Sequence, residues 1–465
     1  ASQTGFGRTG TVDWCTTAKT TPFTAVSGDG FFVNTTSGGI TVTLPASPSA
    51  GDIVAFSDYA NTWDCNALTV CRNGSKINGT CQNVDLNTEG QSVTLVYVDG
   101  TRGWKNVVDS TSNVTGVPNF ICATGGTILT SGDFKTHVFT SDGTFVINTA
   151  PTPGNNSMDY FVVAGGGGGA GGGSTGGGGA GGFRLSNCVG SIPAPTMSPL
   201  VKSCGAITGA IQTYPVTVGG GGAGGPTSSP VKATSGANSI FSTITSTGGG
   251  HGSGSCSPSP PSTGGSGGSG GGGGFPSPGQ PNTGPNSPSS PLRASGGTGN
   301  SPPVSPSQGS NGGKGFHRGA VASGGGGGGA AGSVGGDAVD GYPSGPNSSG
   351  GAGGTGSFIA DAFLGPTAPS YGSPGPVSST RYFAGGGGGS GGQPGFSPAP
   401  EINKAGIGGG GAGATSPSFP FSPDRQAGNG TANTGGGGGG GGSCSTPNPG
   451  GTGGSGVVMI RYKFQ

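Results

Sequence analysis

The feature that most constrains this chain is the glycine run at residues 165–182, GGGGGAGGGSTGGGGAGG. Glycine has no side chain to bury, and it loses more conformational freedom on folding than any other residue. A run of this length is therefore either a flexible, low-complexity linker or a structure that is stabilised through its backbone. Similar runs recur at 219–225, 264–274, 324–329, 385–392, 408–413, 435–442 and 450–456.

The few side chains inside these runs recur every third residue, which favours an ordered structure. Ser266 and Ser269 are three residues apart, and so are Thr452 and Ser455. A period of three is typical of the polyproline II conformation, which has no internal hydrogen bonds, so its backbone amides must bond to neighbouring runs. The sequence predicts a bundle of polyglycine II helices, with all-glycine runs such as 435–442 at its centre and Ser269 facing outward at its rim.

Composition excludes several classes of partner. The hydrophobic fraction of 29% is too low for a conventional core throughout the chain, and only 8% of residues are charged, with a formal net charge of +1. Because no basic stripe exists to neutralise phosphates, we expect no nucleic-acid partner. The longest apolar stretches, such as 93–98, are far too short to span a membrane, so membrane insertion is not expected either.

The nine cysteines and three histidines do not form a recognisable metal motif. No C-x-x-C occurs, and the histidines are distant in sequence from one another and from any cysteine pair, so no metal is expected. Two groups of cysteines lie close in sequence and leave open whether they are disulfides or buried thiols, namely Cys65, Cys71 and Cys81, and Cys188 with Cys204.

Nothing in the sequence predicts catalysis. The many G-x-G-x-x-G matches do not follow a strand and open a helix, and Gly315 stands where a P-loop needs Ser or Thr. Asp337, Asp340 and Asp361 are too sparse for the acid-lined groove of a depolymerase. We therefore expect no enzyme activity, no catalytic residue and no cofactor. The basic residues Lys314, His317 and Arg318 are interpreted as a solvated loop rather than an anion site.

Residues 1–112 predict a small β-sandwich. Short runs of β-branched and aromatic residues alternate with Gly, Asn, Asp and Pro, at spacings of about 10–15 residues. No helical periodicity occurs in the chain. The expected strands lie at 12–15, 31–33, 40–44, 52–56, 67–70, 93–98 and 104–107.

Residues 113–164 form a second β segment. Residues 133–139 and 144–147 alternate in polarity, and Ser141-Asp142-Gly143 fits a hairpin turn between them. We therefore expect these two strands to pair with each other.

Strand-like residues also precede and follow the glycine runs, so the second β segment is expected to be a base for them. Residues 158–163 lead directly into the first run, and 457–465 predict a final strand. The whole expectation is an all-β fold with polyglycine II helices and no α-helix. Its parts are a sandwich at 1–112, a small β base at 113–164 completed by strand 457–465, and a glycine-rich body with loops at 165–456.

The sandwich carries a set of residues that is recognisable in other proteins. These are Gly51-Asp52-Ile53-Val54, Arg72-Asn73-Gly74 with Ile77 and Gly79, and the segment from Tyr97 to Trp104. With them, the first quarter of the chain resembles a module of tail-fibre and related virion proteins of marine bacteriophages. That resemblance implies a structural part of a fibre, often trimeric.

The junctions between strands and glycine runs form a second such set, at 161–165, 180–184, 214–219 and 454–462. About two thirds of the chain resembles, through these junctions, the tip adhesins of T-even-like bacteriophages and the glycine-rich domain of many phage tail proteins. In the adhesins, polyglycine helices present variable loops that recognise a molecule on the host surface. This chain departs from them in its Pro/Ser-rich loops, as at 255–310, and in its fused fibre module.

The two resemblances imply a non-enzymatic tail-fibre adhesin in an extracellular virion. Its partners would be a host cell-surface molecule (an outer-membrane protein or a polysaccharide), other virion tail proteins and two further copies in a homotrimer. The alternative is a structural subunit of an extracellular filament or virion fibre with no receptor binding. An ice-binding protein is a third class, but the irregular loops do not fit the flat threonine face that it needs.

Candidate recognition residues lie after runs that leave the base, because those runs should carry the chain to the far end. The segments are 226–236, 251–263, 393–403 and 443–449. Aromatic side chains between runs either pack in small cores under loops or stand exposed as binding anchors. The predicted receptor-binding residues are Phe396, Ser397, Pro398, Tyr342 and His251.

Overall fold

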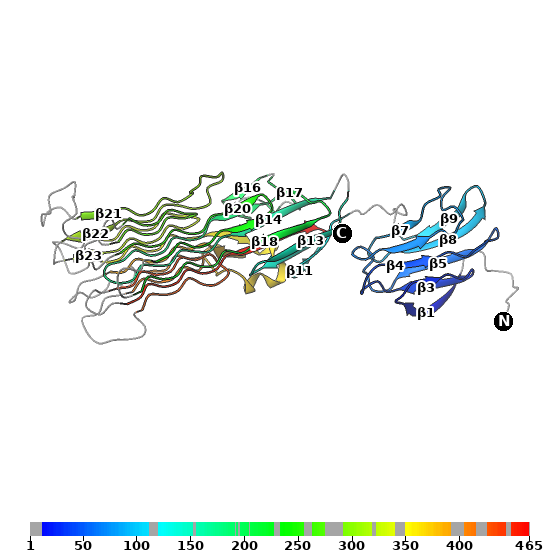
Figure 1. The fold of residues 1–465 in the computed structure, drawn as a ribbon, viewed down its shortest axis with the longest axis horizontal. Coiled ribbons are helices and arrows are strands. Elements are labelled where there is room, and N and C mark those ends of the chain that lie inside the picture. The colour runs from blue at the N-terminus through cyan, green and yellow to red at the C-terminus, as the bar shows by residue number, and fades with distance from the viewer. Residues whose placement is uncertain are drawn as a thin grey trace.

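The structure is a computed structural model of the 465-residue chain. It describes residues 12–110, 120–151, 155–190, 192–193, 196–203, 205–226, 233–254, 263–274, 292–318, 322–339, 349–391, 404–414, 426–442 and 448–464. The described parts form an elongated molecule, with a β domain at one end, a β base next to it and a glycine-rich body that extends from the base (Figure 1).

The N-terminal domain is a sandwich of two sheets, with strand orders β1-β3-β5-β8-β9 and β2-β4-β6-β7. Side chains from both sheets fill the space between them, including Phe56 and Trp104 from the first and Val42 and Leu68 from the second, each 0% exposed. The strands are β1 Asp13–Lys19, β2 Phe23–Thr24, β3 Asp29–Val33, β4 Ile40–Thr43, β5 Ile53–Asp58, β6 Leu68–Cys71, β7 Val84–Leu86, β8 Ser92–Asp99 and β9 Gly103–Asp109.

The chain alternates between these two sheets, so neighbouring strands within a sheet are not consecutive in sequence. β1, β3 and β5 are parallel in one sheet, and β2, β4 and β6 are parallel in the other. β7, β8 and β9 then close the sheets with antiparallel pairs. The sequence predicted the sandwich, whereas this alternation is a feature of the structure alone.

The base consists of two sheets that pack face to face. One has the order β10-β13-β18-β19-β20, and the other has β11-β12-β26-β14-β15-β16, with β17 pairing to β14. Phe145, Tyr214 and Phe241 from the first sheet meet Tyr160 and Tyr462 from the second. The strands are β10 Cys122–Thr124, β11 Thr127–Ser131, β12 Phe134–Phe139, β13 Gly143–Thr149, β14 Ser157–Val163, β15 Phe183–Ser186, β16 Val201–Lys202, β17 Ile207–Thr208, β18 Thr213–Thr217, β19 Ser239–Phe241, β20 Ile244–Ser246 and β26 Val457–Lys463.

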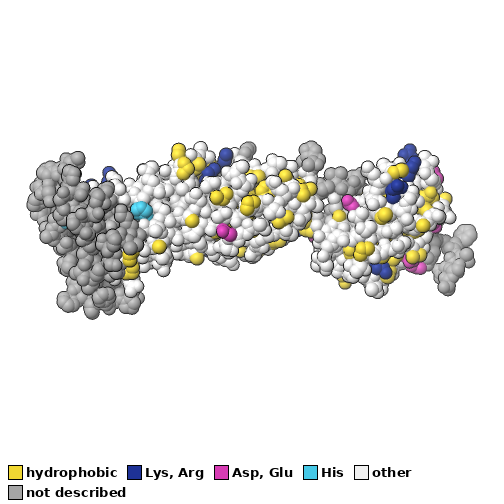
Figure 2. All heavy atoms as spheres, in the orientation of Figure 1, with side chains coloured by type: hydrophobic (Ala, Val, Ile, Leu, Met, Phe, Trp, Pro, Cys, Tyr) yellow, Lys and Arg dark blue, Asp and Glu magenta, His cyan; other side chains and the backbone are white. Residues whose placement is uncertain are grey.

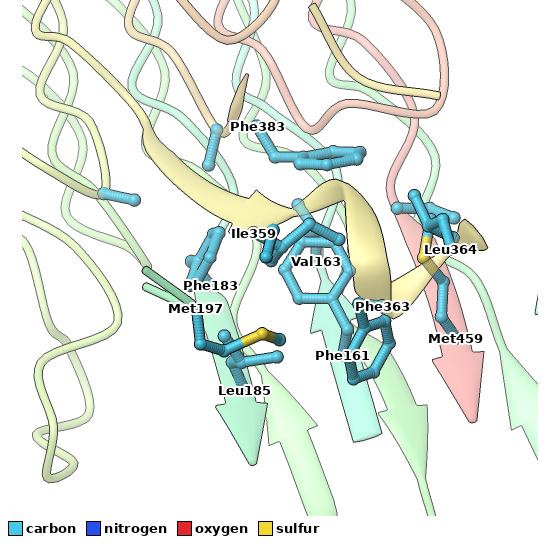
Figure 3. Close-up of a cluster of buried hydrophobic side chains, with 14 of the residues drawn as sticks. Phe161, Val163, Phe183, Leu185, Met197, Ile359, Phe363, Leu364, Phe383 and Met459 are labelled. Carbon is cyan, nitrogen blue, oxygen red and sulfur yellow. The ribbon is translucent and has the colours of Figure 1, made fainter. Parts of the chain in front are cut away.

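The outer face of the larger base sheet is covered by a later part of the chain. This part is the hairpin of β24 Ser357–Ala360 and β25 Thr380–Phe383, with the 3-10 helices η1 Asp361–Phe363 and η2 Gly365–Ser370. Figure 3 shows the resulting cluster, in which Phe161, Phe183 and Phe383 come together. The Phe161 ring lies 4.9 Å from each of the other two rings, edge-on.

The predicted hairpin at Ser141-Asp142-Gly143 is wrong. β12 pairs with β11 and β26, whereas β13 pairs with β10 and β18 in the opposite sheet. The turn therefore crosses between sheets, because Phe139 and Phe145 on its two sides both enter the core between them. A tight hairpin lies just before it, where Ser131 pairs with Phe134 around Gly132 at φ 55°.

The glycine-rich body is a bundle of polyglycine II helices, as the run at 165–171 demonstrates. The amides of Gly165 and Gly168 donate to the carbonyl oxygens of Ala237 and Thr234, in one neighbouring run. The amides of Gly166 and Gly169 donate to Gly454 and Gly451, in a second neighbouring run. Those of Gly167 and Ala170 donate to Gly179 and Gly176, in a third. Successive amides thus point to three different neighbours and return to the first after three residues, which is the threefold helix predicted from the sequence.

Burial follows the same period. In the interior runs 165–170, 267–274 and 436–442 every residue is buried. In rim runs burial recurs at every third residue, at 219, 222 and 225, at 408, 411 and 414, and at 451, 454 and 457, with Gly413 and Gly456 buried in addition. The predicted distinction between central and rim helices is therefore confirmed.

The predicted rim position of Ser269 is wrong, because this residue is fully buried at 0% exposure. The chain bends at 267–269 and reverses direction, which moves the second half of the run 264–274 into the interior. Ser266, three residues earlier, remains exposed.

The two 3-10 helices are the helical elements of the described ranges, which contain no α-helix. Within the same ranges no helix is long and apolar enough to cross a membrane.

Candidate functional site

The glycine runs give the body two distinct ends. The runs that begin at 165, 219 and 248 follow base strands β14, β18 and β20 and are parallel to one another, because Gly222 and Gly249 donate to the run at 165–170. The runs that lead into β15, β19 and β26 are antiparallel to them. The chain therefore leaves the base, reaches the opposite end and returns. We call that opposite end the distal face.

Described residues mark where the outgoing runs arrive at the distal face. Residues at which such runs end next to undescribed segments include Pro226, Gly254, Gly274, Gly391, Ala414 and Gly442. A three-stranded sheet also lies there, composed of β21 Leu292–Ala294, β22 Gly315–Arg318 and β23 Ala322–Gly324 (Figure 1). The distal face is the part of the body where the glycine framework gives way to segments with varied side chains.

A small core supports the described part of this face. Phe316 on β22 is 0% exposed and packs against Ala338, which is 3% exposed. A methyl group at Gly324 would crowd both the Phe316 ring and the Ala338 side chain, so glycine is needed for this close approach. Phe316 was not singled out from the sequence. The sequence signal that could have identified it is a single large aromatic residue between two glycine-rich segments, in Gly-Phe-His-Arg.

The inner helices end below this face in a cluster of buried hydroxyl groups. The Thr175 amide donates to Ser390 Oγ over 2.7 Å, and Ser390 N donates to Thr175 O over 2.9 Å. Thr175 Oγ1 donates to the Gly441 carbonyl oxygen. Both side chains are 0% exposed, so their hydroxyls satisfy backbone groups at the helix ends and contribute rigidity rather than contact with a ligand.

His251 is the one predicted receptor-binding residue that the described ranges include. It lies on the outgoing run 248–254, half-buried at the rim, with Nδ1 3.0 Å from Gly252 O. The carbonyl oxygen of His251 accepts from Gly265 N over 2.8 Å, and the imidazole lies against the Cα of Gly265. Phe396, Ser397, Pro398 and Tyr342 lie outside the described residues.

The aromatic residues between runs fall into two groups. Phe363 is 1% exposed in the cluster of Figure 3, Tyr371 packs against that cluster, and the Phe358 ring lies 5.4 Å from that of Tyr382. These three belong to cores at the base, as one of the two sequence interpretations predicted. The others, Tyr342, Phe396, Phe419 and Phe421, lie outside the described residues.

The basic residues near 314 do not form one exposed patch. Lys314 is exposed, and its amide donates to Asp337 Oδ1 over 2.7 Å. His317 on β22 is 6% exposed, and burial lowers its pKa. Charged side chains are sparse on the face of the body that Figure 2 draws, which leaves hydroxyls, amides and backbone groups as the main contact chemistry there.

A buried cluster of charged and polar groups lies in the base. Asp159, 0% exposed, accepts from Ser186 Oγ over 2.8 Å and from the amides of Cys188 and Val189 over 2.8 and 2.7 Å. Arg461, 4% exposed, donates to Val189 O over 2.8 Å and lies 3.9 Å from the centre of the Phe134 ring. Burial raises the pKa of Asp159 and lowers that of Arg461 to about 10. The cluster fixes the 186–189 turn to the sheet.

His137 is a second buried titratable group of the base. Its Nδ1 lies 2.6 Å from Gly125 O and its Nε2 lies 3.0 Å from the Tyr462 hydroxyl. Burial lowers the His137 pKa to about 4, so the ring is neutral at pH 7. Within the described residues no group of three or more His, Cys, Asp or Glu side chains could hold a metal ion.

The six described cysteines, which include Cys65, Cys71, Cys81 and Cys188, are all free thiols. The sequence left open disulfides or buried thiols; these four residues are thiols, but Cys81 is exposed and the other three are half-buried. Cys204 lies outside the described residues.

The fold and the distal face define a class of protein: a β base that carries a polyglycine II bundle and presents segments at its far end. In agreement with this, a family model described as a glycine-rich domain matches residues 140–463. The match covers well over half of the chain, so the chain belongs to this glycine-rich domain family. A search for curated relatives gave no match.

Proposed function

We propose that this chain is a non-enzymatic bacteriophage tail-fibre adhesin, located in the extracellular virion, that binds a host cell-surface molecule through segments at the distal face. The observation that carries the proposal is the direction of the glycine runs. Each run that follows a base strand leads to the same end, so many separate segments are brought to one face of a rigid body.

Rigidity matters for recognition because flexible loops lose conformational entropy when they bind. Here each interior helix is fixed by hydrogen bonds to several neighbours, and that ordering occurs during folding. The recognition residues in this proposal are Phe396, Ser397, Pro398, Tyr342 and His251. The scarcity of charge on the body favours a polysaccharide or an outer-membrane protein over a strongly ionic ligand.

Assembly into a homotrimer and attachment to other tail proteins belong to the same proposal. Trimerisation would add avidity without any new contact. Support for self-assembly comes from the outward face of the sheet β1-β3-β5-β8-β9, where Trp14 and Val108 lie at the two ends of one row across the strands, with the buried Ala55 between them. Trp14 is 41% and Val108 59% exposed, so both ends of this row present apolar surface to a partner copy.

The test is a binding assay of the purified, fluorescently labelled chain on a panel of bacterial strains. We expect binding to a subset of strains, and loss of that binding when 393–403 is exchanged for a Gly/Ser segment of equal length. Loop exchanges cost little folding free energy, so circular dichroism and the melting temperature should be unchanged. Ile211→Ser is the matched control, since Ile211 is 66% exposed at the base and should not affect binding.

Two results would overturn the proposal. One is binding that survives exchange of all four segments, 226–236, 251–263, 393–403 and 443–449. The other is no binding to any strain by a chain that is nevertheless recovered from purified virions or filaments, which would establish the structural-subunit alternative.

A further inference from the structure

The N-terminal domain and the base meet at a small cluster of polar side chains. Asp64 and Cys65 belong to the segment between β5 and β6, and Lys135 belongs to β12 of the base. Lys135 Nζ lies 3.7 Å from Asp64 Oδ2 and 3.9 Å from Cys65 Sγ. The Lys135 and Asp64 side chains are only 20% and 16% exposed, so each domain shields the other's polar groups.

Two thiols from different domains meet in this cluster. Cys122, on β10 of the base, is 3% exposed, whereas Cys65 is half-buried. The two side chains are hydrogen-bonded to each other, and both are free thiols in the structure. The two domains are also joined by the chain itself, which passes from residue 110 to residue 120 through undescribed residues.

We propose that Cys65 and Cys122 are a site of oxidative cross-linking, at which a peroxide converts the thiol pair into a disulfide that locks the N-terminal domain onto the base. This inference is independent of the proposed adhesin function, since it concerns the junction and not the distal face. The link requires the two sulfur atoms, which share a hydrogen bond across the junction, to close to bonding distance.

The environments of the two sulfurs assign their roles. The hydrogen bond from Cys122 lowers the pKa of the Cys65 thiol, and the Lys135 ammonium acts in the same direction, against burial and Asp64. The same hydrogen bond and burial raise the pKa of Cys122. Cys65, more exposed and more readily ionised, is therefore the nucleophile towards the oxidant, and Cys122 is the resolving thiol.

The reaction balances in two steps with hydrogen peroxide as the oxidant. The Cys65 thiolate attacks one peroxide oxygen, the O–O bond breaks, and Cys65 becomes a sulfenic acid while hydroxide leaves. The Cys122 sulfur then attacks the Cys65 sulfur, the S–O bond breaks, and the oxygen leaves as water with the Cys122 proton. Two thiols are oxidised by two electrons, and one peroxide is reduced to two waters.

The experiment uses the full chain, reduced and then treated with hydrogen peroxide, followed by alkylation of remaining thiols and tryptic mapping without reduction. The expected result is a disulfide between the peptides 20–72 and 106–135, which contain Cys65 and Cys122. Cys71 shares the first peptide, so the Cys71→Ser variant must form the same link. Cys65→Ser and Cys122→Ser must each abolish it.

A kinetic measurement tests the assigned roles. Lys135→Met should slow disulfide formation several-fold and shift the pH profile of the rate to higher pH, whereas Lys202→Met in the base should not. Wild-type protein in which Cys65 and Cys122 remain fully alkylatable after peroxide treatment, or in which Cys65 pairs with another cysteine, overturns the proposal. The wild-type map alone can overturn the proposal, and the Cys71→Ser map assigns the link to Cys65, so a Cys65 or Cys122 variant that fails to fold does not affect the test.

Discussion

The amide of Gly438 donates a 2.9 Å hydrogen bond to the carbonyl oxygen of Gly167. The two residues belong to the last and first outgoing runs of the body, so this bond joins its two extremes in sequence. Three residues further along both runs, Gly441 bonds to Ala170 in the same way. The body is therefore held together by repeated backbone bonds between distant segments, and its glycines are needed because side chains would separate the helices.

The first prediction follows from this close packing. A Cβ at Gly438 would overlap the carbonyl oxygen of Gly451 in a neighbouring helix. We expect Gly438→Val to destabilise the body by more than about 3 kcal/mol, the upper range for overpacking in a rigid interior. Denaturant unfolding measures the change. Thr452→Val, at an exposed rim position, is the control and should change stability by less than about 0.5 kcal/mol.

The second prediction compares two serines that share the three-residue repeat but differ in their position in the bundle. Ser266 and Ser269 are equivalent in the three-residue repeat, yet Ser266 is exposed and Ser269 is fully buried against Gly309. Ser269→Val should therefore cost roughly 2 kcal/mol through overpacking. Ser266→Val should cost less than about 1 kcal/mol, because it removes only an exposed hydrogen bond from the Thr298 amide. Equal melting temperatures for the two variants would contradict the conclusion that the bend at 267–269 buries Ser269 and leaves Ser266 at the rim.

These two serines also show what the sequence can and cannot predict. The period of three predicts the helix type because it reflects the local backbone, and the burial of 219, 222 and 225 follows it. The position of a helix in the bundle depends on which distant runs surround it. No local signal marks the reversal at 267–269, so Ser269 was placed at the rim.

The β domains show the same limit. Strand positions were predictable from β-branched and aromatic runs, and the predicted strands at 40–44 and 93–98 match β4 and β8 closely. The pairing partners of the strands were not predictable. The polarity of 133–139 and 144–147 is compatible with a hairpin or with two facing sheets, and only the remote strands β18 and β26 decide between them. At the distal face the sequence predicted the outgoing direction of the runs, but four of the five predicted contact residues lie outside the described ranges.

The third prediction concerns pH. Burial holds the His137 pKa at about 4 in the folded protein, against 6.5 for an unperturbed side chain. Between these values the unfolded chain binds a proton that the folded chain does not, so stability falls as pH decreases from about 6.5 towards 4. The full effect corresponds to about 3 kcal/mol.

Other groups titrate nearby, so a variant is needed to isolate this effect. His317 changes stability in the same direction, and Asp159, whose pKa is raised by burial, changes it in the opposite direction. The difference in unfolding free energy between wild type and His137→Gln should therefore depend on pH, with wild type losing its advantage below about pH 6. A difference that stays constant between pH 4 and 7 would contradict a neutral, buried His137.

The fourth prediction tests the buried cluster of the base. Asp159→Ala leaves Arg461 without its counter-charge and removes the acceptor for Ser186 and two amides. Leaving a buried charge uncompensated and buried donors without an acceptor costs about 3–5 kcal/mol. Guanidinium unfolding should detect this loss. Asp133→Ala is the comparison variant and should cost less than about 1 kcal/mol, because its side chain is 55% exposed and pairs only with the exposed Lys463.

The last prediction concerns self-assembly of the N-terminal domain. If copies associate through the outward face of the sheet that ends at β9, a charge on that face should oppose association while leaving the monomer intact. Val108 lies on this face opposite Thr94, and Val26 lies in the turn before β3. Both are 59% exposed, so neither contributes much to the core. We expect Val108→Lys to shift the full chain from trimer to monomer in light scattering, with Val26→Lys unchanged and both variants equally stable. A wild-type chain that is monomeric at high concentration would remove the trimer from the proposed function, and a trimer that tolerates Val108→Lys would place its interface elsewhere.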